Sequence, residues 1–334
     1  MTRVSVIIPT YNRAATLGRA IDSALEQTID DLEVVVVDDG STDDTESVLA
    51  AYEDPRVRTI IHATNQGANV ARNTGLEHVR GEYVAFLDSD DVWHPAKLER
   101  QLAALEARSS IWVGAYCDTA YDLSGTSGWL RSTAASALAR GDDDPTKEGG
   151  EELVGEILAD NVQPGAGSTL LVRTAVARDA GGFDEELDRF QDPEFCLRVL
   201  EQGKLACVDD VLVYRDDTGH PSADVIKNAS RQYLSAYEDE VERFENEGYD
   251  IRSSHELILA KRYLAEGRFL RGAWHLRNAT TSPRSYPGIC WVTGTGVRRR
   301  PLPVVFTLGF LLVALIFGQR ARSRRTRPFA ADRF

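Results

Sequence analysis

Three carboxylates stand within four residues, at the point where an apolar run ends. The run at 83–87 (YVAFL) leads directly into Asp88, Asp90 and Asp91. Carboxylates this close repel one another, and burying them without partners would cost several kcal/mol. Their hard oxygen atoms suit Mg²⁺ or Mn²⁺ better than zinc. The pattern therefore indicates a divalent cation at the end of a strand, although a solvated acidic turn that caps the next helix would have the same sequence.

A second pair of acids flanks a proline further along the chain. Asp192 stands immediately before Pro193, and Glu194 follows it. An acid before proline is a common helix N-cap, and a second acid is favoured in the positive first turn of a helix. On local grounds we interpret Asp192 as an N-cap and Glu194 as an acid of the first helical turn, so only the wider context can give Asp192 a chemical role.

The elements that must position these acids alternate between β-branched runs and segments of helical spacing. The predicted strands lie at 3–12, 33–37, 57–61, 83–87, 111–118, 168–172 and 205–214, with helices at 14–27, around 48–52, at 67–79 and after Pro95. Continuous apolar strands joined in this way predict an α/β fold with a parallel sheet and helices on both faces. Ligands of such sheets bind outside the carboxyl ends of the strands.

Phosphate-binding loops of the common types are missing from this pattern. Neither GxGxxG nor GxxxxGK[ST] follows the first predicted strand. A nucleotide bound by such a fold would need another source of positive charge. A cation held by the acids at 88–91 would supply it, which favours the functional interpretation of that cluster.

Charge is distributed unevenly along the 334 residues, whose formal net charge is −14. Nine arginines and one acid follow residue 297, whereas residues 1–297 hold 29 basic and 51 acidic side chains. This balance argues against a general nucleic-acid-binding protein. Because only five of the 38 basic residues are lysine, we hypothesise a halophilic source; an Arg-rich genome would also explain the composition. The four scattered cysteines indicate a reducing compartment and neither a disulfide framework nor a zinc site.

The C-terminal third changes character. Well before it, residues 122–150 are predicted to form a surface loop, and within it helical patterns lie at 222–247, 254–266 and 268–279. Residues 301–319 carry no charge and lie between arginine clusters, and a span needs about 20 residues. We predict a membrane segment there, which either crosses the bilayer or lies in its interface. A buried core helix would not explain the cationic flanks.

Six motifs occur in one order on the predicted strand ends. They are Val4–Arg13 (VSVIIPTYNR), Val37–Asp43 (VDDGSTD), Ala71–Gly75 (ARNTG), Phe86–Asp91 (FLDSDD), Gly181–Glu185 (GGFDE) and Gln191–Asp192. In this order they resemble glycosyltransferase family 2, which has the GT-A fold, a Rossmann-like, mainly parallel sheet flanked by helices. The resemblance covers about residues 2–215. We therefore predict a GT-A domain at 1–215, a helical region at 216–297, a basic stop and membrane segment at 298–319, and a basic tail at 320–334.

The resemblance implies a donor site. Thr10, Tyr11 and Asp39 would hold the nucleotide base, typically uracil, whose ring N–H a carboxylate accepts. Arg72 would help to bind the donor. These positions predict a nucleotide sugar as a partner, with UDP as the nucleotide.

The acidic motif is the DxD element of this family. Asp88 and Asp90 would hold ribose and metal, with Asp91 beside them, and we assign Asp88 to the donor and Asp90 and Asp91 to Mn²⁺ or Mg²⁺. Such a metal neutralises the departing diphosphate, which is Lewis-acid help to the leaving group.

The resemblance also gives Asp192 a role. It matches the family's catalytic base, which deprotonates the acceptor hydroxyl for one in-line displacement with inversion. Gln191 stands where the family usually has Glu. Gly182, Phe183 and Asp184 would shape the acceptor pocket. The QxxRW element of processive members is missing, so we expect one sugar to be added per encounter, by a hexosyl- or hexuronosyltransferase.

The basic, apolar tail suggests where the acceptor lies. We hypothesise that a catalytic domain on the cytoplasmic side of the cell membrane extends a lipid-linked glycan on dolichyl or polyprenyl phosphate, with membrane lipids as further partners. In a halophilic archaeon the product would be an N-glycan precursor for a surface-layer protein. The alternatives are a polyprenyl-phosphate sugar synthase, a non-catalytic nucleotide-sugar-binding membrane protein and a soluble regulator.

Overall fold

The chain divides into two compact units in the computed structural model, which describes residues 2–121, 146–164, 167–216 and 221–280, with Ile289, Thr293, Gly294 and Gly296. The first unit comprises residues 1–221 and 225–251, and the second comprises residues 222–224 and 252–334. The predicted loop at 122–150 falls largely outside the described residues. The predicted membrane segment at 298–319 lies wholly outside them.

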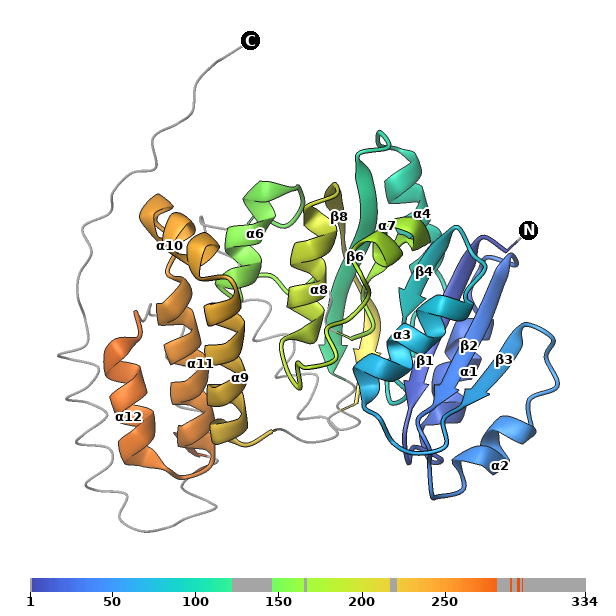
Figure 1. The fold of residues 1–334 in the computed structure, drawn as a ribbon, viewed down its shortest axis with the longest axis horizontal. Helices are drawn as coiled ribbons and strands as arrows, with labels where there is room; N and C mark the ends of the chain where they lie inside the picture. The colour runs from blue at the N-terminus through green and yellow to red at the C-terminus, as the bar shows by residue number, and fades with distance from the viewer. Residues whose placement is uncertain are drawn as a thin grey trace. The chain divides into compact units, whose positions relative to one another are not determined.

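A sheet of eight strands forms the centre of the first unit (Figure 1). Its order is β3-β2-β1-β4-β7-β6-β8-β5. The strands are β1 (Val4–Thr10), β2 (Leu32–Asp38), β3 (Val57–Ile61), β4 (Tyr83–Phe86), β5 (Val92–Trp93), β6 (Trp112–Tyr121), β7 (Leu171–Arg173) and β8 (Lys204–Arg215). The predicted α/β class is confirmed, and the strand positions follow the apolar runs of the sequence.

The sheet is mixed but mainly parallel, which agrees with the fold that the resemblance implies and corrects the wholly parallel sheet predicted from the apolar strands. β1 pairs in parallel with β2 and β4, β2 with β3, and β6 with β8. β7 lies between β4 and β6 and is antiparallel to both, and β5 is antiparallel to β8. An apolar run specifies a buried strand but not its direction, so the sequence could not show that β7 is reversed.

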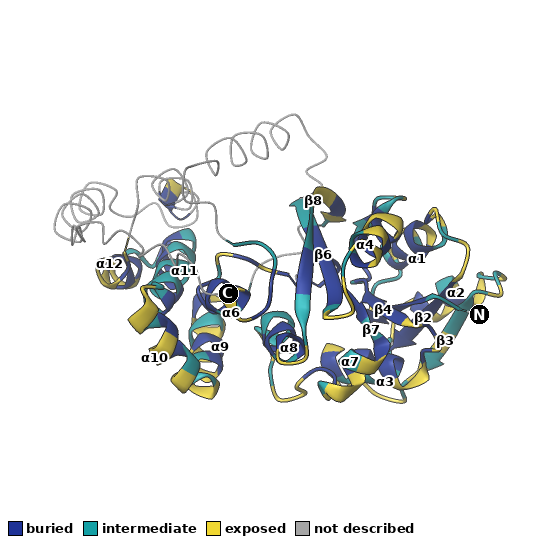
Figure 2. Ribbon diagram, turned by 90° about the horizontal axis from the view of Figure 1, so that it is seen from above, coloured by how far each residue is buried: buried dark blue, intermediate teal, exposed yellow. Residues whose placement is uncertain are grey.

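Helices cover both faces of this sheet, as the sequence predicts (Figure 2). They are α1 (Leu17–Leu25), α2 (Thr45–Ala50), α3 (Ala68–His78), α4 (Lys97–Glu106), α6 (Glu151–Leu158), α7 (Thr174–Asp179) and α8 (Gln191–Leu200). Every residue of β1 and β2 is buried. Successive strand residues point to opposite faces, so Val6 and Ile8 pack into the core beneath α1 and α4, while Ile7 packs into the core beneath α3 and α8.

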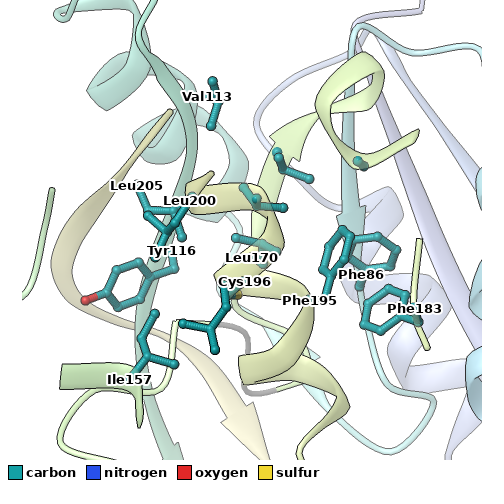
Figure 3. Packing of buried hydrophobic residues seen from close by; sticks show 14 of the residues in the cluster. Phe86, Val113, Tyr116, Ile157, Leu170, Phe183, Phe195, Cys196, Leu200 and Leu205 are labelled. Atoms are coloured by element: carbon teal, nitrogen blue, oxygen red, sulfur yellow. The ribbon is translucent and has the colours of Figure 1, made fainter. Parts of the chain in front are cut away.

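An aromatic cluster joins β4 to α8 in the second of these cores (Figure 3). Phe183 stacks on Phe195 with ring centroids 4.5 Å apart, and Phe86 meets Phe183 edge-on at 5.0 Å. Such pairs contribute about 0.5–1.5 kcal/mol beyond the burial of their area. The cluster fixes α8, and with it Asp192, against the strand that leads into Asp88.

The helices that the structure describes between β8 and residue 280 are α9 (Ala223–Ala236), α10 (Glu238–Glu247), α11 (Ile251–Ala265) and α12 (Phe269–Asn278). The helical stretch predicted at 222–247 is two helices, because the chain leaves helical geometry at Tyr237. α11 and α12 form the predicted helix pair around Gly267, whose φ of +72° favours glycine. In the second unit, Ala260, Leu264, Leu276 and Ile289 form a small core. No helix in the described part of the chain is long and apolar enough to span a bilayer.

Candidate functional site

A cavity of about 640 Å³ opens at the carboxyl edge of β1, β2 and β4. Parallel strands bring their ends together there, as in other open α/β sheets. The predicted residues that line it are Thr10, Tyr11, Asp39, Arg72, Asp88, Asp90 and Asp91, and Arg13, Arg189, Gln191 and Arg215 line it as well. The structure thus brings together all the predicted donor and metal residues.

Thr10 Oγ1 and Arg72 Nε at this cavity are buried, and neither has a hydrogen-bond partner among the residues that the structure describes. Buried polar groups nearly always have partners, so each exception needs an explanation. A polar ligand in the cavity would supply the missing bonds. The two atoms therefore fit a binding role for Thr10 and Arg72.

Each acid of the 88–91 turn has a basic or hydroxyl partner. Asp88 Oδ1 accepts a hydrogen bond of 2.8 Å from Arg72, and Asp90 Oδ2 lies 3.3 Å from an Arg13 nitrogen. Asp91 Oδ2 accepts from Ser168 at 2.6 Å. Burial, and then the charge of Asp88, raise the pKa of Asp91 to about 7. The side chain of Asp91 is 3% exposed and that of Asp90 is 14% exposed, so Asp90 is better placed to reach an ion in the cavity.

The acidic turn at 88–91 could hold a metal ion only if a bound substrate supplied further oxygen atoms. Among the residues that the structure describes, no three His, Cys, Asp or Glu side chains form a metal-binding group. Mg²⁺ is commonly held by one or two carboxylates together with substrate phosphates. Hard oxygen donors from Asp88 and Asp90 beside a polar cavity match that arrangement, and they do not match a closed protein cage.

Asp39 is held by its neighbours. Its carboxylate accepts hydrogen bonds from the backbone N–H of Gly67 at 2.7 Å and of Gln66 at 3.0 Å, and lies 2.8 Å from His62 Nδ1. The sequence did not single out His62 or this backbone segment. Gly40 permits the arrangement, since its φ is +73° and a Cβ there would lie 2.7 Å from the backbone of Thr64. A carboxylate has about four acceptor positions, which leaves room for a base N–H.

Asp192 lies inside the first turn of α8, which corrects its interpretation as an N-cap. The N-cap is Phe190, in the left-handed conformation with φ +62°, and no side chain caps the helix. Asp192 Oδ2 instead accepts the backbone N–H of Gly167 at 3.2 Å. Burial raises the pKa of Asp192 to about 6, although the charge of Arg72 lowers it. Local helix signals could not show this, because Gly167 is 25 residues away in the chain.

Arg72 connects the acids electrostatically. Burial lowers its pKa, but the carboxylates of Asp88 and Asp192 outweigh that effect and leave the pKa raised. Its guanidinium also lies 5.2 Å from the ring centroid of Phe183. The Arg72 cation thus interacts with both Asp88 and Asp192, and its charge opposes the effect of burial on the pKa of Asp192. By contrast, Glu194 is paired with Arg198 and Tyr237, so its role is structural.

The predicted acceptor residues do not line the cavity. Phe183 is buried in the aromatic cluster, and its backbone N–H and C=O bond to Asn73 at 2.8 and 2.9 Å. A Cβ on Gly182 would lie 2.4 Å from Asn73 Oδ1, and the backbone C=O of Asp184 accepts from Asn69 at 2.7 Å. In this structure the three residues brace α3, the helix that carries Arg72. Their contact with an acceptor remains a prediction.

Comparison with known proteins identifies the family of this chain. Residues 5–133 match the model described as "Glycosyl transferase family 2". An uncharacterised glycosyltransferase of Rickettsia prowazekii is 30% identical over 236 residues, which cover 71% of this chain and 69% of that protein. The chain belongs to glycosyltransferase family 2. The resemblance predicted from the six motifs is confirmed.

Other relatives of this family 2 chain are matched over shorter stretches. A UDP-Glc:alpha-D-GlcNAc-diphosphoundecaprenol beta-1,3-glucosyltransferase of Escherichia coli is 40% identical over 102 residues, which are 30% of this chain and 40% of that protein. The chain spans only 33% and 32% of the glycosyltransferases of Rickettsia felis and Rickettsia conorii that it matches.

The fold has solved counterparts. The mannosyltransferase PcManGT of Pyrobaculum calidifontis, solved with GDP-Man and Mn²⁺, has a TM-score of 0.51 and 18% identity, covering 94% of this chain and 79% of that protein. The likeness supports the predicted GT-A-like fold.

Proposed function

We propose that this chain is an inverting, metal-dependent glycosyltransferase that moves one sugar from a nucleotide donor to a hydroxyl. The observation that carries the proposal is the polar cavity at the ends of the parallel strands, with the unpaired Thr10 Oγ1 and Arg72 Nε at its wall and Asp192 held close to Arg72. We propose UDP as the nucleotide, in support of which the Escherichia coli relative is named for UDP-Glc.

The chain's own residues would divide the chemistry between them. Thr10, Tyr11 and Asp39 bind the base, and Arg72 orients the donor beside Asp88. Asp88 and Asp90, with Asp91 beside them in the same turn, would hold Mn²⁺ or Mg²⁺, which would supply positive charge to the leaving diphosphate when bound. Arg13 and Arg215 line the same cavity and add positive charge near that group.

Asp192 would be the general base. Its raised pKa of about 6 keeps it deprotonated at neutral pH yet makes it a stronger base than an ordinary aspartate. It takes the proton of the acceptor hydroxyl while the oxygen attacks the anomeric carbon, and the bond to the diphosphate breaks in the same step. One displacement of this kind inverts the anomeric centre.

We propose a lipid-linked glycan, on dolichyl or polyprenyl phosphate, as the acceptor. The Escherichia coli relative is named for a diphosphoundecaprenol acceptor, and this chain carries the uncharged stretch 301–319 between arginines. We place the catalytic domain at the cytoplasmic side of the cell membrane, where nucleotide sugars and lipid carriers meet. Assembly of a surface-layer N-glycan is a narrower proposal, which rests on the acidic, lysine-poor composition alone.

A panel of UDP- and GDP-sugars, with and without Mn²⁺, tests the proposal. Wild-type chain should consume one donor in a metal-dependent reaction with a polyprenyl-linked extract, and Asp90→Ala and Asp192→Asn should each lose the activity. Glu194→Gln, an acid in the same helical turn with structural partners, is the matched control and should keep it. Turnover that survives in Asp192→Asn would favour a polyprenyl-phosphate sugar synthase, whose anionic acceptor needs no base. Binding without turnover under every condition would indicate a binding protein.

A further inference from the structure

The segment just before β7 contacts both acid sites, and sequence reasoning assigns it no role. Ser168 is fully buried. Its hydroxyl donates a hydrogen bond of 2.6 Å to Asp91 Oδ2 and accepts the backbone N–H of Asp88 at 2.9 Å. One hydroxyl therefore ties the first and last acids of the 88–91 turn together and satisfies a buried carboxylate.

Gly167 makes the corresponding contact with the base. Its N–H donates to Asp192 Oδ2 at 3.2 Å, and its φ is +64°. A Cβ at this position would lie 2.1 Å from Asp88 Oδ2. Only a glycine backbone fits between the carboxylates of Asp88 and Asp192, so this residue sets how closely the donor acid and the base approach.

Buried side chains hold the backbone of Ser168 and Thr169 in place. Trp93 Nε1 donates to the carbonyl of Ser168 at 2.8 Å, and Gln101 Nε2 donates to the carbonyl of Thr169 at 2.8 Å. Lys97 donates to Gln101 Oε1 at 2.9 Å and lies over the Trp93 ring at 3.9 Å. The segment cannot shift without breaking this network, since each of these groups is buried.

We propose that Gly167 and Ser168 form a positioning bridge, which holds the acidic turn of the donor site and the catalytic base in one fixed geometry. The inference rests on the proposed function and deepens it: leaving-group stabilisation at 88–91 and proton abstraction at Asp192 are aligned by a single backbone segment. Neither residue is among those that line the cavity, so we argue that both act through the acids they hold.

Ser168→Ala tests the hydroxyl. Ser5→Ala is its matched control, because Ser5 is also fully buried, donates to the Glu33 carboxylate at 2.7 Å and accepts the N–H of Gly81 at 2.8 Å, away from the cavity. Calorimetry should show that Ser168→Ala weakens binding of UDP with Mn²⁺ about tenfold, as expected for loss of a hydrogen bond to a charged group. Ser168→Thr keeps the hydroxyl and should recover most of the affinity. Ser5→Ala should lower Tm without changing UDP affinity.

Gly167→Ala tests the close approach to Asp88. Gly248→Ala is the control, because Gly248 also has positive φ, +106°, but a Cβ there would meet nothing within 4 Å. Gly167→Ala should lower kcat about a hundredfold or more, since small displacements of catalytic groups are this costly, and Gly248→Ala should lower Tm alone. Wild-type affinity in Ser168→Ala, or an equal loss of affinity in Ser5→Ala, would overturn the bridge. If wild-type chain turned over no donor, the proposed function would fail, while the calorimetry would still decide the bridge.

A second, independent inference concerns the outer face of α12 in the second unit. Leu270 is 77% exposed and Trp274 is 57% exposed, and they lie one helical turn apart. Arg271 and Arg277 lie on the same exposed face, and α12 contains no acid. Arg271 also reaches Asp224 at 3.3 Å. Exposed Leu and Trp beside arginines are typical of helices that lie in a lipid interface.

The charge of the second unit matches one kind of partner. Residues 222–224 and 252–280 hold six basic and three acidic side chains, and residues 281–334 add ten basic and one acidic side chain to the sequence of this unit. We infer that the face formed by Leu270, Arg271, Trp274 and Arg277 docks on an anionic lipid surface. Apolar side chains would enter the headgroup region, and the arginines would bind lipid phosphates.

Quenching by brominated lipid tests this face in the full chain. With vesicles that contain phosphatidylglycerol, wild-type fluorescence should be quenched clearly more than that of Trp274→Phe, and pure phosphatidylcholine should quench neither. Trp112→Phe is the control, because Trp112 packs against the core of the first unit and takes no part in the bridge. Equal quenching of wild type and Trp274→Phe, or no binding to the anionic vesicles, would overturn the docking surface. Neither outcome touches the proposed reaction, which donor hydrolysis without vesicles measures separately.

Discussion

Asp192 is the side chain whose protonation should control the rate. Its pKa is raised to about 6 by burial, so it is charged at neutral pH and loses its charge in mild acid. As a base it must be charged, and kcat should therefore fall about tenfold per pH unit below pH 6 and stay level above it. A pH–rate profile of kcat measures this, and a rate that stays constant down to pH 5 would contradict it.

The raised pKa of Asp192 also means that the charged form of this residue lowers the free energy of unfolding. Because the folded pKa lies above the ordinary value of 3.8, folding is favoured while Asp192 is neutral, and that contribution is lost as pH rises through about 6. Asp192→Asn removes the buried charge and can still accept the N–H of Gly167. At pH 8 we expect the inactive variant to have a Tm at or above that of wild type. A clear fall in Tm would show that the charge is well compensated.

Replacing the Thr10 hydroxyl should stabilise the protein but weaken nucleotide binding. The hydroxyl oxygen is buried and no described residue bonds to it, so Thr10→Val removes a desolvation cost and should raise the free energy of unfolding by about 1 kcal/mol. The same change should weaken UDP binding. Thr169→Val is the matched control. The hydroxyl of Thr169 donates a hydrogen bond of 2.8 Å to the backbone carbonyl of Pro164, and loss of this bond should destabilise the protein. Chemical denaturation with calorimetry measures both quantities, and a destabilised Thr10→Val would contradict the argument.

At the scale of elements, the position of α3 determines where Arg72 lies. Asn73 donates to and accepts from the backbone of Phe183, which ties α3 to the loop before α8. Asn73→Ala leaves two buried backbone groups without partners and should cost about 1–3 kcal/mol of stability. We expect weaker donor binding as well, because Arg72 loses its support. Unchanged unfolding in denaturant would refute the bracing role.

The elements also mark the limit of prediction from sequence. Apolar runs bounded by turns placed β1 to β4, and their shared edge brought Asp39, Arg72 and Asp88 to one cavity. Short elements such as β5 and α7 gave no usable periodicity, since two to six residues carry too little pattern. The contacts of Ser168 and His62 were also invisible, because each joins segments distant in the chain by a side chain of common type. Periodicity reports local structure, and these bonds depend on tertiary packing.

At the scale of the whole molecule, charge is the dominant feature. The first unit has 26 more acidic than basic side chains, while the second has 12 more basic than acidic ones. Repulsion within the first unit opposes its compact state, and dissolved salt screens it over a Debye length of about 10 Å at 0.1 M. Many of the surface arginines are paired with acids, such as Arg100 with Asp210, but exposed pairs contribute only about 0–1 kcal/mol each. Net repulsion should therefore remain.

Salt should consequently stabilise this protein strongly. We expect Tm to rise steadily as KCl increases from millimolar to molar concentration, because the charge of the first unit is screened and its carboxylates remain hydrated. Sucrose at matched osmolality is the control, since it strengthens apolar burial without screening charge, and it should raise Tm by less. Thermal unfolding followed by circular dichroism measures both series. A Tm that does not change with KCl would remove the argument for a halophilic source and leave the acidic composition as a feature of an ordinary Arg-rich protein.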